Sequence, residues 1–401
     1  VGIVTARGLS IFGNTTGLRV AGVSTFTADA TINSVIVGKG ANSVATNTVL
    51  GVNALDAAVT GINNTAVGNQ ALTLNTSGTE NTSVGSETLE ANTTGQRNTA
   101  VGYRALEDNV TGNYNTAVGA YALPENTTGD HNTALGRNAL RYNTTADQNT
   151  AVGALALDGT TTGGSNVAVG YYALKANTTG TGNVAVGVNA LDANTTENYG
   201  TGVGFNVLTA NTSGTNPTAV GAYALNANTT GDYNTACGYS ALELNTTGAQ
   251  NTAVGYKSLE ANTTASNNTA VGHFALNANT TGTQNTAVGR DAGKSITTNS
   301  GCTMIGATAG QANTAANNTA LGSGALYANT TGTQNTALGG GVYGSTQGAL
   351  GANTTGDHNT AVGSRSLLLN TTGSSNTAVG DRALDANTTQ ANNVAIGYRS
   401  L

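Results

Sequence analysis

Short apolar runs alternate with runs rich in Asn, Thr and Gly along nearly the whole chain. The segment that begins at Asn98 reads Asn-Thr-Ala-Val-Gly, Tyr-Arg, Ala-Leu-Glu-Asp-Asn and Val-Thr-Gly-Asn-Tyr, and we number its residues as positions 1 to 17. Apolar runs of about five residues, bounded by turn-forming residues, are typical of short strands. Each segment therefore predicts two short strands joined by two turns.

The same segment recurs along the chain with a period of 17 residues. This repeat is too short for the helix pairs of an α-solenoid and fits one β-coil. Units begin at residues 47, 64, 81, 98, 115, 132, 149, 166, 183, 200, 217, 234, 251, 268, 285, 302, 318, 335, 359, 376 and 393. We therefore predict an all-β fold, a parallel β-solenoid or β-roll of about 21 coils with 17-residue repeats.

The repeat divides the chain into two parts. Residues 47–401 are predicted to form the solenoid shaft, and residues 1–46 a β-rich segment that leads into it. The unit that begins at Asn335 is 24 residues long and carries an inserted loop at about residues 340–348. Insertions in solenoids project as loops on one face.

Alternation within the strand predicts which side chains face the interior of the coil. Side chains alternate between the two faces of a strand, so positions 2 and 4 share one face and position 3 lies on the other. We expect positions 4 and 9 to form the coil core, as in Val101, Leu106, Val118 and Leu123. Position 3 is nearly always Ala, and we expect this stripe to lie against the second layer of the coil or against sister chains, as at Ala100, Ala117, Ala151, Ala253 and Ala270.

The composition argues against several classes of protein. Only 34 of the 401 residues are charged, 56 are Gly and none is Trp, which is unlike an ordinary globular enzyme. A formal net charge of −6 with 14 Lys and Arg provides no basic surface for nucleic acid. No apolar run approaches the roughly 18 residues needed to span a membrane. We expect no catalytic site, cofactor, metal or nucleic-acid partner, and no membrane insertion.

Two sets of motifs resemble known fibre proteins. Residues Asn33–Gly38 and Asn393–Gly397 resemble the strand motif of YadA-like head repeats, which are left-handed parallel β-rolls of trimeric autotransporter adhesins. The Asn-Thr-Ala-Val-Gly and Asn-Thr-Thr-Gly repeats are also similar to those of phage tail fibres, notably those of cyanophages. The adhesin heads have a shorter repeat than this chain, so their handedness and interfaces transfer poorly.

The resemblance implies an extracellular, homotrimeric filament without enzymatic activity, on a virion tail fibre or a cell surface. Its implied partners are a host cell-surface receptor or glycan and other fibre or tail proteins. We therefore expect a structural shaft for host or surface attachment. The alternatives are a bacterial trimeric surface adhesin or extracellular filament and, more remotely, an ice-binding β-solenoid suggested by the regularly spaced Thr residues.

Three features of the sequence suggest local sites. The inserted loop is a candidate receptor or lateral contact, or else a tolerated surface loop, through Val342, Tyr343, Ser345, Thr346 and Gln347. The Asn-X-Thr sequons, as at Asn92 and Asn126, could accept glycans, but Asn residues that stack from coil to coil explain their repetition better. Aromatic residues gather after the first strand of the unit, where they could stack on sugars or pack between chains.

Two glycines interrupt the core pattern. The run Gly289–Ser295 resembles a phosphate-binding loop, but three residues separate its glycines where four are required. We interpret it as a divergent coil. Gly293 and Gly310 replace the Leu of position 9, which predicts a local thinning or bend of the coil.

Overall fold

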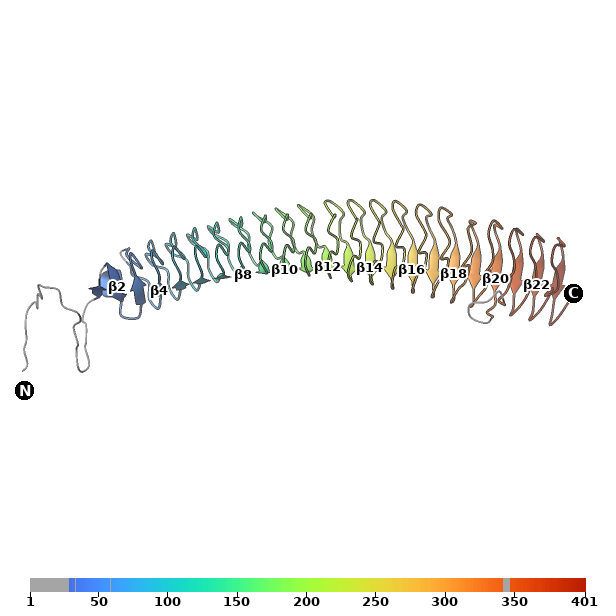
Figure 1. Cartoon of the computed structure of the whole chain (residues 1–401), viewed down its shortest axis with the longest axis horizontal. Helices are drawn as coiled ribbons and strands as arrows, with labels where there is room; N and C mark the ends of the chain where they lie inside the picture. The colour runs from blue at the N-terminus through green and yellow to red at the C-terminus, as the bar shows by residue number, and fades with distance from the viewer. Residues whose placement is uncertain (1–28, 33, 58, 342–346) are drawn as a thin grey trace, which may run out of the picture.

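The computed structural model describes residues 29–32, 34–57, 59–341 and 347–401. These residues form a bowed rod in which the chain winds through successive coils, with the strands aligned along one side (Figure 1). The parallel β-solenoid predicted from the repeat is confirmed, since one strand of each unit from Asn47 onward joins a continuous parallel sheet.

The strands stack in strict register. Ala100 pairs with Ala117, so each residue lies beside its counterpart in the next unit, and the register survives the insertion, where Ala337 pairs with Ala361. The parallel strands are β3 (Thr48–Gly51), β4 (Thr65–Val67), β5 (Thr82–Val84), β6 (Thr99–Val101), β7 (Thr116–Val118), β8 (Thr133–Leu135), β9 (Thr150–Val152), β10 (Val167–Val169), β11 (Val184–Val186), β12 (Thr201–Val203), β13 (Thr218–Val220), β14 (Thr235–Cys237), β15 (Thr252–Val254), β16 (Thr269–Val271), β17 (Thr286–Val288), β18 (Thr303–Ile305), β19 (Thr319–Leu321), β20 (Thr336–Leu338), β21 (Thr360–Val362), β22 (Thr377–Val379) and β23 (Val394–Ile396).

A small antiparallel element precedes the first coil. Strand β1 (Ala30–Ile32) pairs with β2 (Val35–Gly38), and β2 pairs antiparallel with β3. A single 3₁₀ turn, η1 (Ala41–Ser43), follows. Strand β2 thus covers the edge that β3 would otherwise leave unpaired, which is how native sheets protect a free edge.

Each coil contains one strand rather than the two that we predicted. Positions 6 to 11 form a chain of turns, as in residues 103–108. Arg104 and Leu106 have φ angles of 56° and 52°, so the backbone there is left-handed instead of extended. The prediction of a second strand was wrong because neither residue type signals this conformation in a sequence.

The core of the coil is built from the face opposite to the one we predicted. Ala100 is fully buried, whereas Val101 and Val118 are only half-buried and lie on the outer face. Leu106 and its equivalents are buried as expected. The position 3 alanines are all inside the coil, so the expected packing against the second layer of the coil holds at Ala100, Ala117, Ala151, Ala253 and Ala270. The alternative, that this stripe contacts sister chains, does not hold.

The reason for this orientation is the narrow space between the strand and the turn segment. A Cβ atom built on Gly202, at position 3, would lie 3.2 Å from Val207 Cγ1 and 3.3 Å from Leu191 Cγ. The side chains of positions 8 and 9 therefore already occupy the space above the strand. Only a small residue fits beneath them, and this selects Ala.

The two units that lack Leu at position 9 show the same constraint. Met304 replaces Ala at position 3, and a Cβ on Gly310 would approach its Sδ atom to 2.3 Å. A Cβ on Gly293 would lie 3.0 Å from Ile296 Cδ1. Larger side chains thus fill the room that the two glycines leave, so the expected thinning of the core does not occur.

Buried asparagines connect most of the coils, with breaks at position 12 where Thr160 and Ile296 replace Asn. Asn109 Nδ2 at position 12 donates to Asn92 Oδ1 at 2.8 Å, and Asn126 Nδ2 donates to Asn109 Oδ1 at 2.8 Å. A second row at position 1 uses the backbone, since the Asn98 amide donates to Asn81 Oδ1 at 2.9 Å. The predicted asparagine ladder is confirmed, and it occupies the sequon residues Asn92 and Asn126 completely.

Candidate functional surfaces

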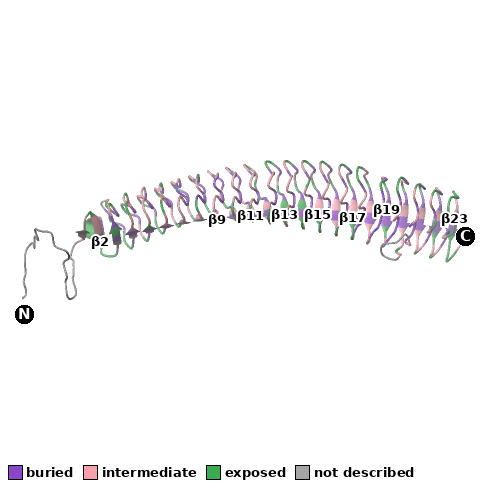
Figure 2. Ribbon diagram, in the orientation of Figure 1, coloured by how far each residue is buried: buried purple, intermediate pink, exposed green. Residues whose placement is uncertain are grey.

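The outer face of the parallel sheet presents two straight rows of side chains, which we call the strand face. One row holds Thr or Val at position 2, and the other holds Val, Leu, Ile or Cys237 at position 4. Neither row contains a charged residue in any strand from β3 to β23. Buried, intermediate and exposed residues alternate along each coil (Figure 2).

The strand face is both apolar and open within a single chain. Its exposed members include Val84, Leu135, Val220, Val254 and Leu321. Within the described part of the chain, the hydroxyls of the position 2 threonines make no side-chain hydrogen bond. This face, and not the alanine stripe, is therefore the uncharged surface that a partner could cover.

Aromatic side chains at positions 6 and 7 form a ladder in the middle of the rod. Tyr239 stacks on Tyr256 with ring centroids 5.5 Å apart, and Tyr256 stacks on His273 at 5.1 Å. Phe205 meets Tyr223 edge to face at 5.5 Å. These ring contacts stabilise the coil stack, while Phe205, Tyr239 and Tyr256 remain exposed at the surface.

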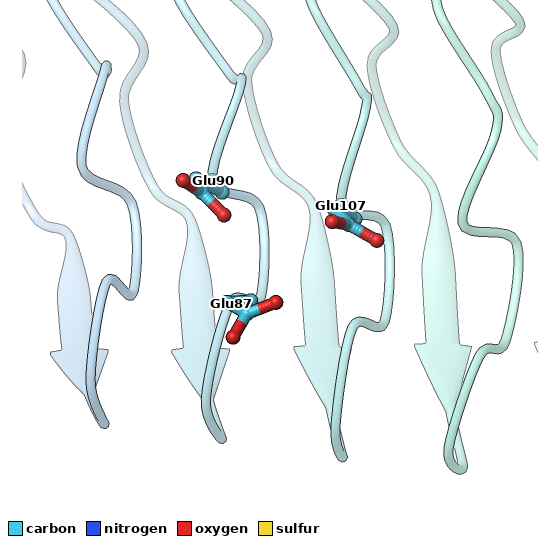
Figure 3. A group of neighbouring side chains, drawn as sticks. All are labelled: Glu87, Glu90 and Glu107. Atoms are coloured by element: carbon cyan, nitrogen blue, oxygen red, sulfur yellow. The ribbon is translucent and has the colours of Figure 1, made fainter.

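Three carboxylates meet on the turn segments of two adjacent coils. Glu87, Glu90 and Glu107 place one oxygen each within 4.8 Å of one another, and Figure 3 shows them projecting from neighbouring turns. Arg104 Nε lies 2.6 Å from Glu87 and 3.6 Å from Glu107, and Gln70 Nε2 donates to Glu90 at 3.0 Å. Each carboxylate thus has a protein partner, and we assign no metal to the cluster.

A polar groove of about 540 Å³ lies beside this cluster and spans three coils. The coils that begin at Asn98, Asn115 and Asn132 each contribute residues from positions 7, 10 and 11, and the last of them also contributes position 6. Six of the lining residues are charged, and two tyrosines add apolar surface. The lining residues are Arg104, Glu107, Asp108, Tyr121, Pro124, Glu125, Arg137, Asn138, Arg141 and Tyr142. The groove is not evident in the sequence, because its residues are scattered over 39 positions and converge only when the coils stack.

The inserted loop lies largely outside the described residues. Val342, Tyr343, Ser345 and Thr346 belong to the undescribed stretch, so their predicted contact role stays a prediction. Gln347 is described, and its Oε1 accepts a hydrogen bond from Arg365 Nη2 at 2.8 Å.

The sequon asparagines cannot accept glycans in the folded coil. The Nδ2 atom of Asn126 is buried and donates to both Asn109 Oδ1 and Gly129 O, at 2.8 and 3.0 Å. A glycan would require that nitrogen. Glycosylation at these sites would therefore have to precede folding and would disrupt the ladder.

Known proteins provide no independent assignment of this chain. No known protein family matches it, and no curated protein is significantly similar to it in sequence. Among the described residues, no helix is long and apolar enough to cross a membrane.

Proposed function

We propose that the chain is a structural subunit of an extracellular fibre, in which copies associate through the strand face to form a rigid shaft for attachment to a host or another surface. The strand face carries this proposal. At a strand spacing of about 4.8 Å, its 21 strands extend for roughly 100 Å. The uncharged Val and Leu row of the face follows this whole length, and a continuous row of exposed apolar side chains is typical of an interaction surface.

A second copy of the same chain is the occupant that fits best. It presents rows with the same axial repeat, so apolar side chains can interdigitate coil by coil along the whole rod. A partner with another spacing would fall out of register within a few coils. The choice of three copies rests on the resemblance to trimeric adhesin heads and tail fibres.

Light scattering of the intact chain in native buffer tests the proposal. A mass near three chains supports a homotrimeric shaft, and electron microscopy should then show rods about 100 Å long. A stable single chain at micromolar concentration would contradict it. Cys237, exposed on the strand face, should also crosslink between copies with a bifunctional maleimide, whereas Cys302 is buried.

Two adjacent residues provide a matched pair of variants for this test. Val254 is exposed on the strand face and Ala253 is fully buried in the coil. Val254→Glu should lower the mass toward one chain and preserve the far-UV circular dichroism spectrum. Ala253→Glu should reduce the β signal itself, because an unpaired charge cannot be accommodated in the core. Equal effects of the two variants would contradict the assignment of the faces.

One observation favours a second function. The position 2 threonines form a flat, regular row whose hydroxyls are free of hydrogen bonds within the described chain, and such arrays are presented by ice-binding β-solenoids. Val replaces Thr in β10, β11 and β23, which interrupts the row. Thermal hysteresis of a single-chain species would favour ice binding, and its absence would remove this function.

A further inference from the structure

The polar groove across the coils that begin at Asn98, Asn115 and Asn132 concentrates the chain's sparse charges. The whole chain has 34 charged residues, and six of them line this one groove on three of the 21 units. Three are arginines and three are carboxylates, so the formal charges of the lining cancel. A shaft that only has to stack coils does not need such a concentration.

Several polar groups in the groove have no partner among the residues that the structure describes. Asn138 is 8% exposed, yet its side-chain amide makes no hydrogen bond with a described residue. At position 7 of two later coils, by contrast, asparagines pair with each other, since Asn189 Nδ2 donates to Asn206 Oδ1 at 2.9 Å. Arg137, next to Asn138, likewise forms no ion pair with the described residues.

Two of the three carboxylates that line the groove have no hydrogen-bond donor within the described chain. Asp108 and Glu125 make no side-chain hydrogen bond or ion pair within the described chain. Burial raises the pKa of Glu125, and the nearby Asp108 raises it further. A ligand that supplies hydroxyl donors would relieve this unfavourable environment without adding charge.

Apolar surfaces alternate with these polar groups. Tyr142 is 39% exposed, and the Arg141 guanidinium lies 4.1 Å from its ring centroid. The ring of Tyr121 is half-buried and packs edge to face on Tyr103, with the ring centroids 5.3 Å apart. Rings of this kind offer an apolar body with a polar rim.

We propose that this groove binds a neutral saccharide unit of a surface glycan. Hydroxyl groups can donate to Asp108 and Glu125 and accept from Arg137 and Asn138, while the C–H faces of a sugar pack on Tyr142 and Tyr121. The balanced charge of the lining disfavours both polyanions and cations. A volume of about 540 Å³ lies within the usual range for small-molecule sites. This inference rests on the proposed attachment function, to which it adds a ligand class and a place on the shaft.

Calorimetric titration of the intact chain with maltotriose, cellotriose and mannotriose tests the proposal. We expect at least one of these neutral trisaccharides to bind, and the double variant Arg137→Ala with Asn138→Gly to weaken its binding by about tenfold or more, since two hydrogen-bonding groups are lost. Glycine is chosen because Asn138 has a φ of 56°, which glycine adopts without strain. The matched control is Arg290→Ala with Asn189→Gly, which changes the same positions in other coils and should leave the affinity unchanged.

Three outcomes would overturn the groove assignment. The first is that none of the three trisaccharides binds. The second is that the double variant binds the trisaccharide with unchanged affinity, and the third is that the chain prefers trigalacturonic acid to the neutral sugars. Each can occur while light scattering still reports an assembled rod, in which case the shaft proposal stands. A single-chain mass together with saccharide binding would instead overturn the shaft and retain the groove.

Discussion

Replacing Thr160 by Asn should stabilise the solenoid, because it would repair a natural break in the asparagine ladder. Thr160 occupies position 12 and is fully buried. Its hydroxyl accepts from Asn177 Nδ2 at 3.3 Å, but it has no amide to donate to the preceding coil. Asn143 Oδ1 is accordingly buried without a partner. An Asn at this position would supply the missing donor.

The size of the effect follows from the contacts of intact coils. Where two successive coils both have Asn at position 12, the distance from Nδ2 of one to Oδ1 of the other is short, as in the 2.8 Å hydrogen bond from Asn126 to Asn109. A buried acceptor without a partner costs about 1–3 kcal/mol. Thr160→Asn also loses the packing of one methyl group, worth about 0.8 kcal/mol. We therefore expect a net gain of roughly 1 kcal/mol in the free energy of local opening.

Amide hydrogen exchange is the suitable assay, because a long solenoid does not unfold in one cooperative step. Peptides that cover residues 143–177 should exchange about fivefold more slowly in Thr160→Asn than in the unmodified chain. The reverse change, Asn126→Thr, breaks an intact ladder and should accelerate local exchange. Thr162→Asn makes the same chemical change at an exposed site and should have no effect. Unchanged exchange in both Thr160→Asn and Asn126→Thr would refute the view that the ladder stabilises the rod.

Three further predictions concern the backbone, the core and the carboxylates. Leu106→Ile should lower the free energy of unfolding by about 2 kcal/mol or more, because a β-branched residue is strained at a φ of 52°. In thermal denaturation, the control variant Leu106→Met should show a much smaller effect. Met304→Ala should cost about 2–4 kcal/mol, and adding Gly310→Leu should restore most of it in a double-mutant cycle, since either large side chain fills the same space. Burial raises the folded-state pKa of Glu107 and Glu125, so the folded chain binds more protons than the unfolded chain above the ordinary glutamate pKa. Denaturation should therefore show stability falling as the pH rises from about 4.5 toward 7, and Glu107→Gln with Glu125→Gln should flatten this dependence.

The repeat alone was sufficient to predict the fold class, the number of coils and the asparagine ladder. A period of 17 residues places equivalent residues side by side in a solenoid, so every unit start from Asn47 to Asn393 corresponds to one parallel strand. The sequence did not show which face of the strand is interior. Val is more apolar than Ala, and the pattern therefore favoured Val101 for the core, but the space above the strand is too narrow for it.

The left-handed residues explain the other error. A second strand would require extended backbone at positions 6 to 11, yet Arg104 and Leu106 adopt positive φ angles. Neither residue is Gly or Asn, the residue types that would indicate such a conformation in a sequence. The groove was missed for a related reason. Its residues are unremarkable in sequence, and only the stacking of three coils brings Arg104, Asp108 and Arg137 to one surface.

The thin core has a consequence for how the rod is stabilised. A typical coil buries two alanines and one leucine, as with Ala100, Ala105 and Leu106, and small side chains contribute little apolar area. Hydrogen bonds between coils compensate at the strand and at the turns, as in the bonds from Thr99 N to Asn115 O and from Leu106 N to Ala122 O, at 2.8 and 3.0 Å. The strand face is an apolar surface that remains exposed, because its Val and Leu residues lie outside the coil. Covering that face with further copies of the chain would bury the valine row that the coil interior cannot hold, and this is why the orientation of the strands favours an assembled fibre over a single solenoid.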